Sequence, residues 1–217
     1  MSRERVRPTR DETRQRLFEA AAAVFVERGI GGASIEDICR QAGLTRGALY
    51  SNFENKDELV LAMLDDHLED TIAETERLMA MAADPTDYLG LLESDERRRE
   101  GPLGSNPVLY MEFILYALRD PSNRPRLVER QRRLRELIAT IVRRDVERLG
   151  RPLPMPIEDA AELILALDDG YSLHELIEPG TYAPGTFSKN LLVLQRLWAS
   201  APPAPPTPPV RRRSRGR

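Results

Sequence analysis

Residues 34–53, SIEDICRQAGLTRGALYSNF, predict two short helices separated by a glycine. Ser34 can cap the first helix while Asp37, at its third position, reaches back to the cap, and Gly43 ends that helix. Thr45 is suited to cap the second helix, whose apolar positions recur at three- and four-residue spacing. Helices this short need neighbours to bury their apolar faces. The segment therefore predicts a small helical domain.

The second of these helices lacks an acidic side chain in its first turn. An acid there would favour the helix dipole, as it does in the neighbouring helices, but the third position after Thr45 is Ala48. The omission is explained if this helix terminus meets phosphate. Small side chains would let the backbone approach a DNA groove, and Arg46 could pair with phosphate or guanine. A helical hairpin whose small residues only pack closely is the alternative.

The run AGLTRGALYSNF at residues 42–53, followed by KDEL at 56–59, resembles the signature of TetR-type transcriptional regulators. The resemblance covers about residues 9–64. It implies an all-α fold, in which an N-terminal three-helix helix-turn-helix DNA-binding domain precedes a larger C-terminal helical ligand-binding and dimerisation domain. It also implies DNA-facing positions, to which we add the cap residue: Ser34, Thr45, Arg46, Gly47, Ala48, Tyr50, Ser51, Asn52 and Lys56. Ser51 and Asn52 stand where many members carry an aromatic residue and a histidine.

The length of 217 residues is sufficient for two domains. We expect an arm and DNA-binding domain at 1–55, a ligand-binding and dimerisation domain at 56–200, and a disordered Pro/Arg-rich tail at 201–217. The formal charge of −3 means that DNA binding must come from a local patch. Arginines in the first 16 residues can supply such a patch, although a solvated leader is equally compatible.

Helices are predicted at residues 10–28, 55–79, 86–99, 108–119, 124–149, 157–177 and 187–198, with a Gly/Pro-rich loop at 100–107. The last two carry apolar side chains around more than half of their circumference, so they need a second partner surface. Pairing two copies would build a four-helix bundle. The predicted dimer residues are Leu163, Leu167, Tyr171, Phe187, Leu191, Leu194 and Trp198. A thicker monomer core is the alternative.

The larger domain is expected to hold a cavity for a small-molecule effector. Its predicted lining is Met63, Tyr88, Tyr110, Glu112, Phe113, Tyr116 and Asp168. A carboxylate within an apolar run is costly unless it is paired. Glu112 and Asp168 could therefore receive a cationic or hydroxylated ligand group or a buried arginine, and Asp168 could instead serve the dimer seam.

No cofactor or metal is expected. The single cysteine, Cys39, lies on an apolar helix face, and His67 and His174 lack the spacing of metal ligands. The sequence shows neither a membrane span nor a signal-peptide core, which favours a soluble, cytoplasmic protein.

These features together predict a dimeric repressor that a small-molecule effector releases from a palindromic operator in double-stranded DNA. An all-helical binding protein or enzyme with a vestigial helix-turn-helix is the alternative. In a third interpretation, the arginine tail or the region of Glu100 recruits a protein.

Overall fold

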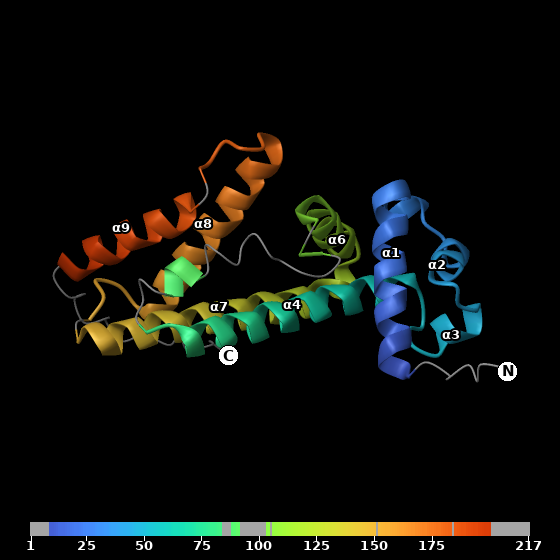
Figure 1. Ribbon diagram of the computed structural model, residues 1–217, viewed down its shortest axis with the longest axis horizontal. Helices are drawn as coiled ribbons and strands as arrows, with labels where there is room; N and C mark the ends of the chain where they lie inside the picture. Colours follow the sequence, from blue (N-terminus) through green and yellow to red (C-terminus); the bar gives the residue numbers. More distant parts are fainter. Residues whose placement is uncertain are drawn as a thin grey trace, which may run out of the picture.

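Every regular element is a helix in the residues that the computed structural model describes, which are 9–83, 88–91, 103–104, 106–150, 152–183 and 185–200. The elements of Figure 1 are α1 (Arg10–Gly32), α2 (Ile35–Ala42), α3 (Arg46–Tyr50), α4 (Lys56–Met81), α6 (Pro107–Arg119), α7 (Arg124–Leu149), α8 (Ile157–Ile177) and α9 (Thr186–Ser200), with a 3-10 turn at Pro121–Asn123. The predicted all-α fold is confirmed.

Three predicted features fall largely or wholly outside the described residues. These are the helix at 86–99, of which only residues 88–91 are seen to be helical, the arm before residue 9, and the tail from residue 201.

The N-terminal helices begin at the predicted caps. The Ser34 hydroxyl accepts a hydrogen bond from the Asp37 amide at 3.1 Å, and Thr45 Oγ1 accepts one from the Ala48 amide at 3.2 Å. These side chains satisfy backbone donors that have no partner within the helix. Gly43 ends α2 with a left-handed φ of 63°, a conformation that glycine adopts without steric cost.

Gly29 breaks α1 where the sequence predicts its end, but one further helical turn follows to Gly32. The backbone at Gly29 is left-handed, with a φ of 69° and a ψ of 158°. The amide of the next residue, Ile30, donates to Glu112 Oε1 of α6 at 3.0 Å. Glu112 therefore ties α6 to the break in α1.

The helices form an elongated molecule in which α1–α3 occupy one end (Figure 1). Helices α4 and α7 run side by side along its length, α6 packs against α1 and α4, and α8 and α9 lie at the other end. The core around α1–α3 also takes in the first turns of α4 and the inner face of α6. The predicted domain division at residue 55 thus does not coincide with a division of this core.

Candidate DNA-binding surface and ligand cavity

Helix α3 buries one side chain and presents the others. Leu49 is fully buried, whereas Thr45, Gly47 and Ser51 are exposed and Tyr50 keeps 46% of its surface accessible. The amide of Asn52 and the hydroxyl of Ser51 both donate to the carbonyl oxygen of Ala48, at 2.8 and 2.9 Å. The face that the sequence assigns to DNA is therefore a solvent-facing surface, on which small residues and short hydroxyls lie beside Arg46 and Tyr50.

Arg46 is held only loosely on this face. Its guanidinium lies 2.8 Å from Glu36 Oε1 and 5.9 Å from the centre of the Tyr50 ring. The two side chains of the ion pair are 60% and 49% exposed, and pairs of this kind contribute about 0–1 kcal/mol. A phosphate or a guanine edge can displace Glu36 at that small cost.

Two predicted DNA contacts have structural roles in this conformation. The Ser34 amide donates to Asp37 Oδ2 at 3.3 Å, which completes its capping box, and the Ser34 hydroxyl donates to the same oxygen at 2.6 Å. The Lys56 ammonium donates to the carbonyls of Ile30 and Ala33 at 2.7 and 3.0 Å, at the end of α1. An ammonium has three donors, so Lys56 retains one for a phosphate.

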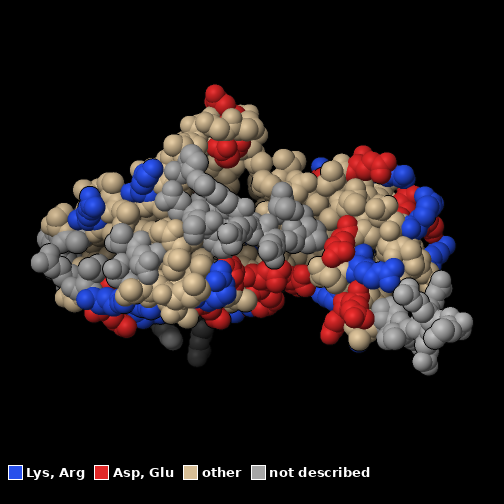
Figure 2. Space-filling model, in the orientation of Figure 1, with Lys and Arg blue, Asp and Glu red and all other residues tan. Residues whose placement is uncertain are grey.

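Charge near α3 is mixed. In Figure 2 the right-hand end, which holds α1–α3, carries both basic and acidic side chains. Asp37 is contacted by Arg28 and Arg40, each at 3.0 Å. Hydrogen bonding to Ser34, followed by these two guanidinium groups, lowers the pKa of the Asp37 carboxyl although partial burial opposes the shift.

A cavity of about 190 Å³ lies between α4, α7, α8 and α9. Its walls are mostly leucine, isoleucine and valine, with a few polar groups: Thr71, Thr75, Tyr88, Asp145, Asp168 and Gln195. Apolar walls with few polar groups are typical of small-molecule sites. A second hollow, of about 450 Å³ between α4 and α7, is a more open surface groove with charged walls, so the less open cavity is the candidate ligand site.

Asp145 is the functional candidate that the sequence interpretation missed. Its Oδ2 accepts a hydrogen bond from Gln195 Nε2 at 3.0 Å. Burial raises the pKa of this carboxyl to about 6, against the opposing effects of Arg148 and Arg144. Burial and the nearby Asp145 carboxylate raise the pKa of the Tyr88 hydroxyl to about 12, so this hydroxyl remains protonated.

Five of the predicted cavity residues lie elsewhere. Met63 and Phe113 belong to the core around α1–α3, where Phe113 packs edge-on against Phe25 at 5.5 Å. Tyr110 and Tyr116 pack against the same core, and Glu112 binds the Ile30 amide. None of these five residues lines the cavity, because Met63 and the inner face of α6 pack in the core of the DNA-binding end. Tyr88 and Asp168 do line the cavity.

Two family models match this chain: bacterial regulatory proteins of the tetR family over residues 17–63, and the C-terminal part of BetI-type transcriptional repressors over residues 92–191. The chain belongs to the TetR family. A probable helix-turn-helix regulator of Pseudomonas putida, ArpR, is 40% identical over 85 residues, which are 39% of this chain and 38% of that relative. The curated relatives first matched are thus covered over about two fifths of their length or less. They are transcriptional regulators and not enzymes.

Solved structures of TetR-like regulators share the fold over most of this chain. A regulator of Saccharomonospora viridis in complex with choline is 19% identical, covers 86% of this chain and 96% of its own, and superposes with a TM-score of 0.68. FadR of Bacillus subtilis in complex with stearoyl-CoA is 18% identical, and the match covers 82% of this chain and 95% of FadR. The two structures superpose with a TM-score of 0.65.

The side chains of the predicted dimer residues on α9 face the interior of the same chain. Phe187, Leu191 and Trp198 line the cavity, and Leu194 packs in the cluster of α7, α8 and α9. This stripe therefore packs within the chain, and a sequence does not distinguish it from a partner face because both appear as apolar stripes. Tyr171 is also engaged within the chain, since its ring packs against Phe187 at 5.7 Å.

Other apolar side chains of α8 and α9 face solvent. On α8 they recur at three- and four-residue spacing: Leu163, Ala166, Gly170, Leu173 and Ile177, with Gly170 half-buried. Ile177 is 72% exposed, and Leu197 of α9 is 62% exposed. Of the predicted dimer residues, Leu163 lies on this stripe and Leu167 is half-buried. A contiguous exposed apolar stripe of this kind is typical of an interaction surface.

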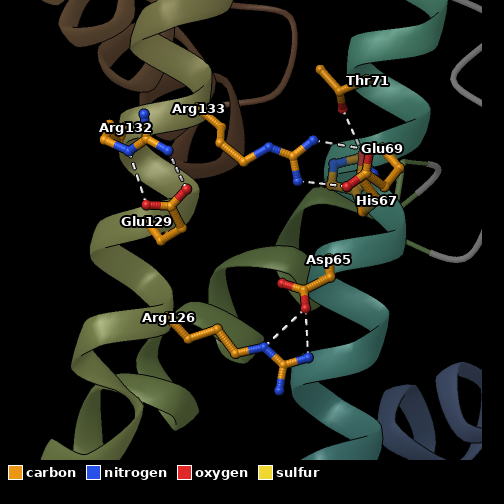
Figure 3. Close-up of polar contacts among 8 residues, drawn as sticks. All are labelled: Asp65, His67, Glu69, Thr71, Arg126, Glu129, Arg132 and Arg133. Carbon is orange, nitrogen blue, oxygen red and sulfur yellow. Dashed lines mark hydrogen bonds and ion pairs between the residues drawn. The ribbon is translucent and has the colours of Figure 1, made fainter.

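Ion pairs join the two long helices between the cavity and the DNA-binding end (Figure 3). Arg126 of α7 donates to Asp65 of α4 at 2.9 Å and to Glu58 at 3.1 Å, and Arg133 of α7 donates to Glu69 at 2.5 Å. Each pair is partly exposed and individually weak, and all of them join α7 to residues 58–69 of α4.

Other kinds of site have little support in the described part of the chain. No cluster of three or more metal-ligating side chains occurs there. Cys39 is buried, and this burial raises the pKa of its thiol, which lowers its reactivity. Within the same ranges, no helix has both the length and the apolar character that crossing a membrane requires.

Proposed function

We propose that this protein is a sequence-specific DNA-binding regulator that acts as a dimeric repressor in the cytoplasm and leaves a palindromic operator when a small molecule binds. The single observation that carries the proposal is the exposed α3 face, with Thr45, Arg46 and Tyr50 free of core contacts and no acidic residue in its first turn. A surface of this composition suits the major groove and its phosphates.

Dimerisation is supported by the exposed stripe of α8 and the neighbouring apolar residues of α9. Two copies related by a two-fold axis would bury both stripes in a four-helix bundle. Gly170 lies within the stripe, and a Cβ atom placed there would meet nothing within 4 Å, so two α8 helices can approach closely at that point. A dimer also presents two α3 helices to successive major grooves, which lie about 34–36 Å apart.

Response to a ligand is supported by helix α4, which passes from the DNA-binding end to the cavity. Lys56 at its start contacts the end of α1, and Thr71 and Thr75 line the cavity. The relatives bound to choline and to stearoyl-CoA show that this fold accommodates small molecules. A ligand preferring one spacing of the α3 helices changes DNA affinity by its differential binding, typically about 1–3 kcal/mol.

The proposal is tested by selecting bound fragments from the source genome and measuring their affinity at several salt concentrations. We expect a two-fold symmetric site whose binding weakens steeply with salt. Arg46→Ala and Tyr50→Ala should each reduce specific binding by tenfold or more. Arg132→Ala is the matched control, since Arg132 is an equally exposed, paired arginine of α7. Wild-type affinity in the two α3 variants, or no selected site, would exclude the proposed interface.

A further inference from the structure

The cavity contains a carboxylate that makes no ion pair with the described residues. Asp145 accepts one hydrogen bond, from the neutral amide of Gln195 at 3.0 Å, and no ion pair reaches it from that part of the chain. The nearest arginines of its own helix are used elsewhere, because Arg144 donates to the Met79 carbonyl and Arg148 to that of Ala83. A carboxylate has about four acceptor positions, so Asp145 can accept further donors.

The remaining cavity wall suits a positive charge. The described lining contains no lysine, arginine or histidine, but it contains a second carboxylate, Asp168. Three aromatic rings, Tyr88, Phe187 and Trp198, complete it. Aromatic faces attract cations through their quadrupole, and carboxylates repel anions.

The size of the cavity limits the ligand. A cavity of about 150 Å³ lined by apolar side chains holds one benzene molecule, so about 190 Å³ accommodates on the order of eight heavy atoms at similar packing. That is sufficient for one ring with a short polar substituent.

We propose that the cavity binds a small organic cation, an ammonium group on an aromatic or compact apolar body, with Asp145 as its counter-ion. The ammonium donates to the free positions of the Asp145 carboxylate, and the apolar body lies between the aromatic rings and the aliphatic walls. This assignment names the class of effector for the function proposed above and rests on that function.

Three probes of the same shape test the assignment: benzylammonium, benzyl alcohol and benzoate. Trp198 is the only tryptophan of the chain and lines the cavity, so its fluorescence reports binding directly. At pH 7.5 we expect benzylammonium to bind at least tenfold more tightly than benzyl alcohol, and benzoate to bind more weakly than either. Equal affinities, or a preference for the anion, would overturn the assignment.

Asp145→Asn keeps the shape and removes the charge, so it should make the affinities for benzylammonium and benzyl alcohol equal to within about twofold. Glu147→Gln, an exposed position on the same helix, should leave the tenfold preference unchanged.

A second measurement, the pH dependence of binding to the wild type, needs no variant. Lowering the pH from 7.5 to 5 protonates most of the Asp145 carboxyl while benzylammonium stays charged, so the cation preference of the wild type should fall several-fold. A preference that survives both changes would show that Asp145 is not the counter-ion.

Binding to the selected DNA fragment is measured with the same preparations. Specific DNA binding without a cation preference refutes the ligand class and leaves the regulator intact. A cation preference without DNA binding refutes the regulator and leaves the cavity assignment standing.

Discussion

Replacing Asp145 by asparagine is expected to stabilise the ligand-free protein at neutral pH. The pKa of this carboxyl is about 6 in the folded state and 3.8 in the reference state, so folding favours its protonated form. A carboxyl with a raised pKa makes folding less favourable as the pH rises from about 4 to about 6, and the loss is complete above that range. Asparagine has no such titration, and its side-chain oxygen can still accept from Gln195.

The magnitude follows from the two pKa values. Their difference corresponds to about 3 kcal/mol at pH 7.5. Asp145 is only half-buried, and solvent screening reduces this to about 1.5 kcal/mol. For a chain of this size we expect Tm to rise by about 3–6 °C at pH 7.5 and by about half as much at pH 5.

The assay is thermal unfolding, measured at both pH values for the wild type, Asp145→Asn and Glu147→Gln. Glu147→Gln should change the free energy of unfolding by less than about 0.5 kcal/mol, since the side chain is exposed. A lower Tm for Asp145→Asn at pH 7.5 would refute the reasoning, because it would mean that the folded protein stabilises the charged carboxylate.

Three further substitutions test the fold and the proposed dimer. Phe113→Ala removes a fully buried ring packed against Phe25 and should cost about 3–5 kcal/mol in urea denaturation, with a smaller loss indicating that the core collapses around the gap. Gly43→Ala imposes a Cβ on a φ of 63° and should cost about 1–2 kcal/mol in the same assay, and an unchanged midpoint would mean that the turn adopts another conformation. Leu173→Glu places a charge in the α8 stripe and should give monomers in sedimentation velocity, whereas Leu115→Glu on α6 should not; dimers in both variants would place the interface elsewhere.

Helix positions could be predicted from the sequence because their ends are set by local chemistry. Helices α7 and α8 have the predicted bounds, 124–149 and 157–177. Pro125 suits the first turn of α7 and Gly150 closes it with a left-handed φ of 62°. Such signals act within a few residues, so they can be interpreted without knowledge of the tertiary fold.

The partner of each apolar face could not be predicted in the same way. Phe113 of α6 and Trp198 of α9 both lie on apolar stripes, but Phe113 packs against α1 and Trp198 lines the cavity. The choice between core, cavity and dimer interface depends on how the helices are arranged in space. Periodicity contains no information about that arrangement.

The position of Asp145 on the apolar side of its helix could have been predicted from the sequence. It lies within the charged run RRDVER, which is typical of a solvated face, but it also follows Ile141 and Val142 by four and three residues. That spacing places the carboxyl on the apolar side of α7. A charged residue in register with an apolar stripe is therefore a stronger indication of a site than the composition of its immediate neighbours.

The continuity of α4 has a mechanical consequence. Its 26 residues span about 39 Å without a break, from the contact of Lys56 with α1 to the neighbourhood of the cavity. A rigid rod of that length turns a tilt of about 5° at one end into a displacement of about 3 Å at the other. In the proposed dimer the two displacements would add, so that the proposed single-ring ligand could shift the two α3 helices out of register with the DNA grooves.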